Sequence, residues 1–148
     1  MEIVENTLDR SLEEFLEQPL FCFLSTLSLD GDPRTSPLWF LWEDELIWII
    51  GDSEKTYSKR IEHHPQTSLA IVDFDVFSGR VHHVGMRGKA TIVPLEKDRV
   101  YRVLRRYLDD ERDDWDPRFS SLDPEQWRFI RFEPETVVAR DQSFRRVS

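Results

Sequence analysis

The sequence contains a single cysteine, Cys22, among its 148 residues. One cysteine cannot close an intramolecular disulfide, and it cannot build a zinc site from thiolates. Glycine is also scarce, at five residues, and no Gly-x-Gly-x-x-Gly, Gly-x-Ser-x-Gly or Gly-Lys-Ser/Thr loop occurs. The sequence therefore gives no sign of the common dinucleotide-binding, hydrolase or P-loop sites.

The sequence also lacks long apolar runs, and it has fewer basic than acidic residues. No run approaches the roughly eighteen apolar residues of a membrane-spanning helix, and residues 1–5 do not resemble a secretory signal. Twenty Lys and Arg against 29 Asp and Glu give a net charge of −9, which disfavours nucleic acid and anionic membranes as partners. We expect a cytoplasmic protein in which residues 1–148 form one domain.

Aromatic residues, in contrast, are abundant: ten Phe, five Trp and three Tyr. Such a composition excludes a disordered acidic chain, which would be poor in aromatics. The rings exceed what the core of one small barrel readily hides, and aromatics are enriched in interface cores. The sequence therefore predicts a homodimer, with Trp39, Trp42 and Trp48 on a shared face; the alternative is that these rings fill the barrel.

Hydrophobic periodicity predicts about seven strands and three helices. Helical spacing indicates helices over about 8–16 and 54–63 and another from residue 95. Extended apolar runs predict strands at 21–29, 34–42, 46–50, 67–74, 80–93, 127–132 and 136–139. Because most neighbouring strands are joined by hairpin turns such as 30–33, the expected fold class is mainly β, a small antiparallel barrel of six to seven strands with two to three helices.

The helix predicted over 54–63 carries a cluster of cations. Four of its side chains fall within an arc of about 140°: Lys55, Thr56, Lys59 and Arg60. Tyr57 and Ile61 point the opposite way, towards the core. A helix N-terminus adds free N–H groups and partial positive charge, so this face suits a phosphate. An ordinary solvated helix face is the alternative reading.

Other polar residues are less informative. Arg34, Thr35 and Ser36 open an otherwise apolar strand, which fits either a bound polar ligand or a strand entrance. His82 and His83 are neighbours in a predicted strand, so their rings face opposite sides and cannot share a metal. We predict no metal site, and we interpret Cys22 as a packed small hydrophobe.

A series of motifs follows in order along residues 8–93. After an opening helix they are 23–27 (FLSTL), 30–39 (DGDPRTSPLW), 48–51 (WIIG), 55–61 (KTYSKRI), 65–69 (PQTSL) and 83–90 (HVGMRGKA). Together they resemble the pyridoxamine 5′-phosphate oxidase-like family, which has the FMN-binding split β-barrel fold. Residues 138–144 resemble the tail of a subgroup of small, uncharacterised members.

The resemblance implies a homodimer with FMN held at the subunit interface. It assigns cofactor contacts to Arg34, Thr35, Ser36, Leu38, Trp39, Ile50, Gly51, Lys55, Thr56, Lys59 and His83. The sequence departs from the family pattern at Trp39, where the vitamin-synthesising enzymes often carry a lysine, and at 140–143, where their substrate motif is not reproduced. We therefore expect FMN binding without the named oxidase activity.

The leading functional hypothesis is an FMN-dependent oxidoreductase acting on an unknown small molecule. The flavin itself exchanges hydride or electrons, which explains why no acid–base pair stands out and no catalytic residue is assigned. One alternative is a reductase using the deazaflavin F420, whose acidic tail would call for an extended basic track. Another is a haem-binding or flavin-carrying protein without turnover, in which His83 or His64 would be an axial ligand.

Overall fold

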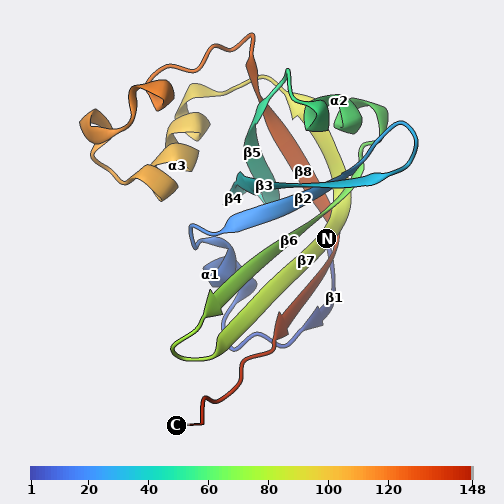
Figure 1. The fold of residues 1–148 in the computed structure, drawn as a ribbon, viewed down its shortest axis with the longest axis vertical. Coiled ribbons are helices and arrows are strands. Elements are labelled where there is room, and N and C mark those ends of the chain that lie inside the picture. The colour runs from blue at the N-terminus through green and yellow to red at the C-terminus, as the bar shows by residue number, and fades with distance from the viewer. Residues whose placement is uncertain (148) are drawn as a thin grey trace.

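The computed structural model describes residues 1–147 and shows one curled sheet with helices at its edges (Figure 1). The strands are β1 (Glu2–Asn6), β2 (Phe21–Leu27), β3 (Pro33–Trp39), β4 (Leu41–Glu43), β5 (Leu46–Asp52), β6 (Gln66–Asp75), β7 (Arg80–Val93) and β8 (Trp127–Asp141). The helices are α1 (Leu12–Leu16), α2 (Thr56–His63) and α3 (Lys97–Leu108), with 3₁₀ turns at Arg112–Asp114 and Pro117–Phe119.

The strands are hydrogen-bonded in the order β3-β2-β6-β7-β8-β5-β4, and all these pairings are antiparallel. β1 adds to β8 in parallel. No ladder joins β3 to β4 among the described residues, so the curled sheet is open along this line, as in a split barrel. The predicted fold class, mainly β with two to three helices, is confirmed. None of the described helices is both long and apolar enough to span a membrane.

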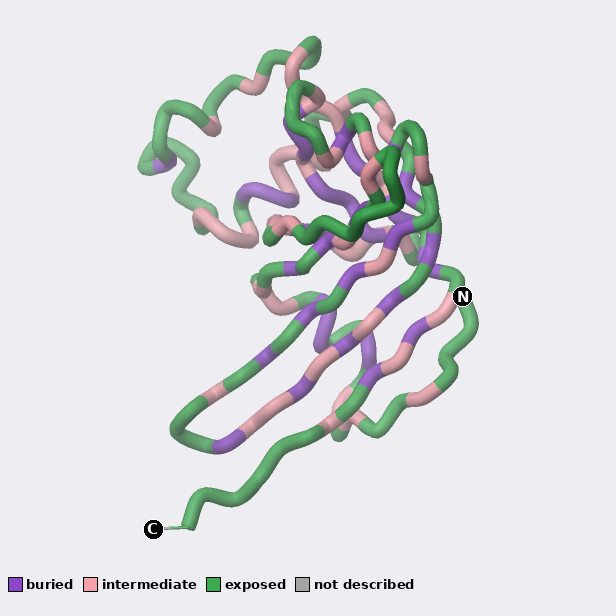
Figure 2. The backbone as a smooth tube through the Cα atoms, turned by 45° about the vertical axis from the view of Figure 1, so that its right-hand side comes forward, coloured by how far each residue is buried: buried purple, intermediate pink, exposed green. Residues whose placement is uncertain are grey.

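The core fills the concave side of the sheet because buried and exposed residues alternate along the strands (Figure 2). α1 covers one opening with Leu12, Phe15 and Leu16, all buried. The α1 N-cap is Ser11, whose hydroxyl accepts a hydrogen bond from the Glu14 N–H at 3.1 Å. Helix α1 is therefore shorter than the predicted helix over 8–16.

The predicted strand over 34–42 is divided at Phe40, where the chain changes partners. β3 pairs with β2, whereas β4 pairs with β5. Phe40 is fully buried between them, and its N–H donates to the Tyr107 hydroxyl at 3.0 Å instead of to a strand. The same hydroxyl donates to the Leu20 carbonyl at 2.7 Å. Through Tyr107, helix α3 thus provides hydrogen-bond partners for backbone groups that have no strand partner at the corner where the sheet turns.

The two strands predicted over 127–132 and 136–139 are one strand, β8, because a bulge accommodates Pro134. The β7–β8 register passes from Arg87 opposite Thr136 to Gly88 opposite Pro134, so Glu135 has no partner. At Gly88 the two backbones approach so closely that an added Cβ would overlap the Glu133 carbonyl oxygen. Gly88 is the residue that permits this approach.

The three tryptophans predicted on a shared face all make contacts within the chain itself, and Trp42 packs partly buried against the core. A face shared between two chains stays a prediction. Trp48 is 6% exposed, and the Arg99 guanidinium lies 3.7 Å from its ring centroid. The Trp39 ring stacks on Tyr107, with centroids 4.6 Å apart. Both partners belong to α3, which covers this side of the sheet. Apolar exposure lies instead on β2 and β6, at Phe21, Phe23, Val72 and Phe74.

Candidate functional site

A hollow of about 540 Å³ lies between the β2–β3 turn and α2. Its lining residues are Ser28, Leu29, Asp30, Arg34, Thr56, Lys59, Arg60 and His63. In Figure 1 the β2–β3 hairpin reaches across the molecule to the green helix α2. The residues that line the hollow come from these two segments. Arg34, Lys59 and Arg60 make the hollow cationic, and Asp30 is the one acid among its lining residues.

Helix α2 supplies four of these residues from a single stripe. Thr56, Lys59, Arg60 and His63 have the spacing i, i+3, i+4, i+7, which puts them on one face. The opposite face, with Tyr57 and Ile61, packs against the core as predicted. The Tyr57 hydroxyl accepts a hydrogen bond from the Asp52 N–H at 2.8 Å, and burial raises the pKa of Tyr57. Tyr57 therefore orients the helix and does not face the hollow.

The strands bring Arg34 to the same place. Arg34 stands opposite Thr26 in the β2–β3 ladder, and the Arg60 Nε donates to the Thr26 hydroxyl at 2.7 Å. The buried Thr26 therefore ties α2 to the hairpin and holds Arg60 beside Arg34. The structure thus joins the two polar features of the sequence, the strand start and the helix face, in one cationic site.

Lys55 lies just outside this arrangement. The helix begins at Thr56, two residues later than predicted, and Lys55 is its extended N-cap residue with ψ of 150°. The helical wheel that grouped Lys55 with Lys59 therefore does not apply to it. Lys55 is exposed and is not among the lining residues of the hollow.

The remaining predicted residues of β3 divide between its two faces. Ser36 and Leu38 share the face of Arg34, opposite the buried Leu24 and Cys22 of β2. The other two point to the opposite, outer face: Thr35 and Trp39. Cys22 is fully buried, and burial raises the pKa of its thiol to about 12, so it remains a protonated core residue as predicted.

Ile50, Gly51 and His83 are not brought to the hollow within one chain. Ile50 and Gly51 lie near the end of β5, from which the chain enters α2. His83 lies on β7, three strands from β3 in the sheet order, so about 14 Å separates the two strands. Its Nδ1 lies 3.2 Å from the Gln142 side-chain oxygen. As predicted, His82 faces the opposite way and is buried.

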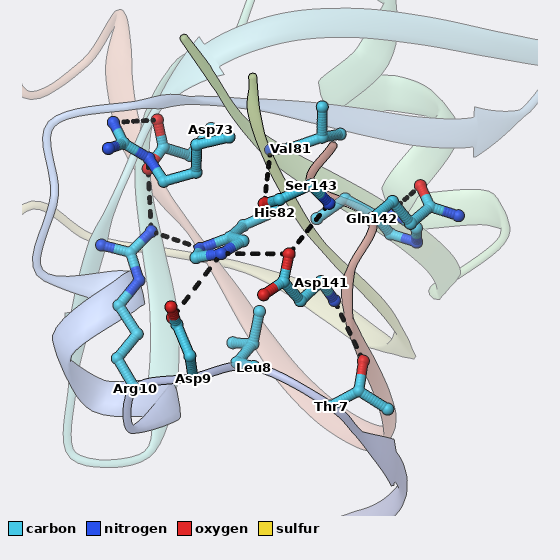
Figure 3. Close-up of polar contacts among 12 residues, drawn as sticks. Thr7, Leu8, Asp9, Arg10, Asp73, Val81, His82, Asp141, Gln142 and Ser143 are labelled. Carbon is cyan, nitrogen blue, oxygen red and sulfur yellow. Dashed lines mark hydrogen bonds and ion pairs between the residues drawn. The ribbon is translucent and has the colours of Figure 1, made fainter. Parts of the chain in front are cut away.

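A second polar cluster surrounds His82 (Figure 3). The His82 Nε2 lies 3.6 Å from an Asp9 oxygen and 3.5 Å from an Asp141 oxygen. A metal could in principle sit between these three side chains. However, the Arg10 guanidinium, which can only donate, lies 2.9 Å from the His82 Nδ1. Nδ1 is therefore the acceptor, and the proton of the neutral ring sits on Nε2, where a metal would have to bind. The geometry favours a hydrogen-bonded link between the 7–10 segment and the sheet.

The family model described as pyridoxamine 5′-phosphate oxidase matches residues 8–137. The chain belongs to the pyridoxamine 5′-phosphate oxidase family. The match includes the β2–β3 hairpin and α2, and it extends beyond residues 8–93, on which the sequence resemblance rested. A search of curated proteins finds no match to the sequence.

Solved structures share the fold of this family member at low identity. A conserved hypothetical protein from Mycobacterium tuberculosis is 19% identical with a TM-score of 0.75, over 100% of this chain and 97% of the other. An F420 reductase is 23% identical with a TM-score of 0.67, over 88% and 98%. The haem storage protein HutZ from Vibrio cholerae is 16% identical with a TM-score of 0.65, over 89% and 93%. At these identities the likeness establishes the fold alone.

Sequence reasoning missed some of the residues that line the hollow. His63 could have been predicted from helical spacing, because it continues the stripe of Thr56, Lys59 and Arg60 by one turn. No such pattern marks the lining residues of the hairpin tip, Ser28, Leu29 and Asp30. Their position beside α2 depends on the three-dimensional shape of the hairpin. The hollow is consequently flanked by two segments about thirty residues apart in the sequence.

Proposed function

We propose that this family member is an FMN-binding flavoprotein and an oxidoreductase acting on a small molecule. The observation that carries the proposal is the cationic hollow between the β2–β3 turn and α2. In a chain of net charge −9, it gathers three cations, a histidine and two hydroxyls around one space, against a single acid. Such a concentration of donors matches a terminal phosphate better than it matches a neutral ligand.

The donor set fits the phosphate end of FMN. Thr56 lies in the first turn of α2, where hydroxyl and positive helix end act together. Arg34 and Lys59 reach the hollow from opposite walls, and Arg60 is held in place by Thr26. Bound FMN supplies the redox chemistry, so the protein needs only to bind the ring, orient it and exclude competing reactions. The hollow itself holds three cations among the described residues, which is enough for one phosphate but short of the extended basic track expected for F420.

We also propose that two copies pair through the outer face of the sheet. A flat apolar row crosses four strands there: Phe23, Ala70, Gly85 and Val138, in register with one another. Phe23 is 40% exposed, and the neighbouring Phe21 is 50% exposed. Contiguous exposed apolar surface of this kind is typical of interfaces. Trp39 and His83 point to this face, so a partner would bring the hollow of one chain near the outer-face residues of the other.

The phosphate assignment predicts that Lys59→Ala weakens FMN binding. Loss of one charge-assisted contact should raise the Kd about 10- to 100-fold. The matched control is Lys97→Ala, which removes the same charge from α3, away from the hollow, and should leave the Kd unchanged. The measurement is quenching of flavin fluorescence during titration at several salt concentrations.

Equal FMN affinity for the wild type and Lys59→Ala at every salt concentration would contradict the assignment. The visible spectrum of the purified protein separates the alternatives, because FMN, F420 and haem absorb differently. A haem spectrum would replace the proposed function by the haem-binding alternative.

The pairing proposal predicts that Phe23→Glu yields monomers. A charge placed in the middle of the apolar row would be desolvated without a partner in the interface. Light scattering should give the mass of two chains for the wild type and of one for the variant. Val4→Glu, on the exposed strand β1, is the control and should remain dimeric. A wild type that is monomeric with FMN bound would rule out the pairing.

A further inference from the structure

A second and larger cavity, of about 810 Å³, lies between α3 and the acidic segment 109–124. In Figure 1 this segment leaves the end of α3 and folds back beside it in orange, so the helix forms one wall and the segment the other. The volume lies within the range of small-molecule sites, about 300–1,000 Å³. None of the residues lining the cationic hollow lines this cavity.

The cavity has a fixed aromatic wall. Tyr101 of α3 stacks on Trp115, with centroids 5.6 Å apart and planes inclined by 28°. Trp115 is 7% exposed, and its indole N–H donates to the Asp109 carbonyl at 3.2 Å. Phe119, also in the wall, stacks on Trp39 of β3. These contacts hold the three rings in place, and all three contribute to the lining of the cavity.

The charge of the cavity is opposite to that of its surroundings. Four cations line it (Lys97, Arg102, Arg105 and Arg112), against one acid, Asp98. Arg102 is engaged by Glu43 at 2.7 Å. Arg105 and Arg112 form no ion pair within the described part of the chain, although acids abound in 109–116. Both guanidiniums lie over the Tyr101 ring, at 5.8 and 5.7 Å from its centroid.

We propose that this cavity binds a planar aromatic carboxylate. The ring of the ligand would lie against the Tyr101–Trp115 wall, and its carboxylate would pair with Arg105 and Arg112. The planar guanidinium of an arginine can donate two parallel hydrogen bonds to one carboxylate, whereas the ammonium of a lysine cannot. This site is distinct from the proposed FMN site and does not depend on it. Phe119 connects the cavity to the sheet, since it lies in the wall of the cavity and stacks on Trp39 of β3.

The test uses 1-naphthoate as the probe and isothermal titration calorimetry on the full chain. We expect 1-naphthoate to bind and the uncharged isostere 1-naphthalenemethanol to bind about tenfold more weakly or worse. Arg105→Met and Arg112→Met retain most of the apolar stem and should each weaken naphthoate binding about tenfold. The control is Arg118→Met, an exposed arginine of the same segment that does not line the cavity.

Equal binding of the acid and the alcohol by the wild type would overturn the proposal, whatever the variants do. Unchanged naphthoate affinity in folded Arg105→Met and Arg112→Met would overturn it too. Lys59→Ala separates the two sites: it should weaken FMN and leave naphthoate unaffected. If Lys59→Ala abolished naphthoate binding, the probe would be in the cationic hollow and this cavity would not be its site.

Discussion

Gly88→Ala is expected to lower the free energy of unfolding by about 3 kcal/mol, a large part of the roughly 5–15 kcal/mol that keeps a typical domain folded. An added Cβ at Gly88 would overlap the Glu133 carbonyl oxygen and would approach the Phe132 ring to 3.0 Å. The obstacle is backbone on the neighbouring strand, which cannot rotate away as a side chain can. The β7–β8 ladder would have to separate around the bulge. Urea denaturation followed by tryptophan fluorescence measures the effect.

Gly85→Ala is the matched control in the same strand. An added Cβ there meets nothing within 4 Å in the single chain, so at concentrations that keep the chains unpaired the stability should change by less than about 1 kcal/mol. A Gly88→Ala midpoint equal to that of the wild type would show that the two strands are not held as closely as described.

Asp73→Ala is the second substitution with a large expected effect. The Asp73 carboxylate is 7% exposed and accepts hydrogen bonds from Arg10 at 2.8 Å and Arg80 at 3.0 Å (Figure 3). Gln18 also donates to it, at 3.2 Å. Removing the carboxylate leaves the partly buried Arg10 without its counter-charge, which should cost about 3 kcal/mol. Asp32→Ala, in the exposed β2–β3 turn, is the control and should have little effect.

Asp73 also makes stability depend on pH. Burial raises the pKa of this carboxyl, but hydrogen bonds from Arg80, Arg10 and Gln18 outweigh burial and hold the pKa below its ordinary value of 3.8. A carboxyl whose pKa is lower in the folded state than in the unfolded state stabilises the fold at pH values above its unfolded-state pKa. This stabilisation is lost as the pH falls through the folded-state pKa. Wild-type stability should therefore decline below about pH 4. Asp73→Asn should show a shallower decline over the same range, and identical slopes would contradict this role.

Most strands and helices could be predicted from hydrophobic periodicity, because this periodicity indicates which residues are buried. Strands β2, β5, β6 and β7 alternate buried and exposed residues or are continuously apolar, and each was predicted close to its observed range. β1 was missed because none of its residues is buried. It is held by backbone pairing with β8 and by the Glu5–Arg140 ion pair at 3.0 Å, neither of which leaves a hydrophobic pattern. The division at Phe40 depends on the Tyr107 hydroxyl, 67 residues away.

The candidate site was predictable only where one element supplies several residues. The α2 stripe follows from helical geometry, so Thr56 and Lys59 were found together with the inward direction of Tyr57 and Ile61. That Arg34 belongs with them depends on how the hairpin folds onto the helix, and the spacing alone left a solvated helix face open. The cavity beside α3 was not predicted, because the stacking of Trp115 on Tyr101 that forms its wall is a tertiary contact and leaves no periodic pattern in the sequence.

β8 joins the two parts of the sheet, since it pairs with β5, with β7 and with β1. During synthesis, the edges of β5 and β7 therefore stay open until residues 127–141 have left the ribosome. Contacts of such long sequence separation make folding slow, and unpaired strand edges are templates for association with other chains. We expect chains truncated before β8 to aggregate, because their β5 and β7 edges stay unpaired. The last of the described strands is thus the one that joins the two parts of the sheet.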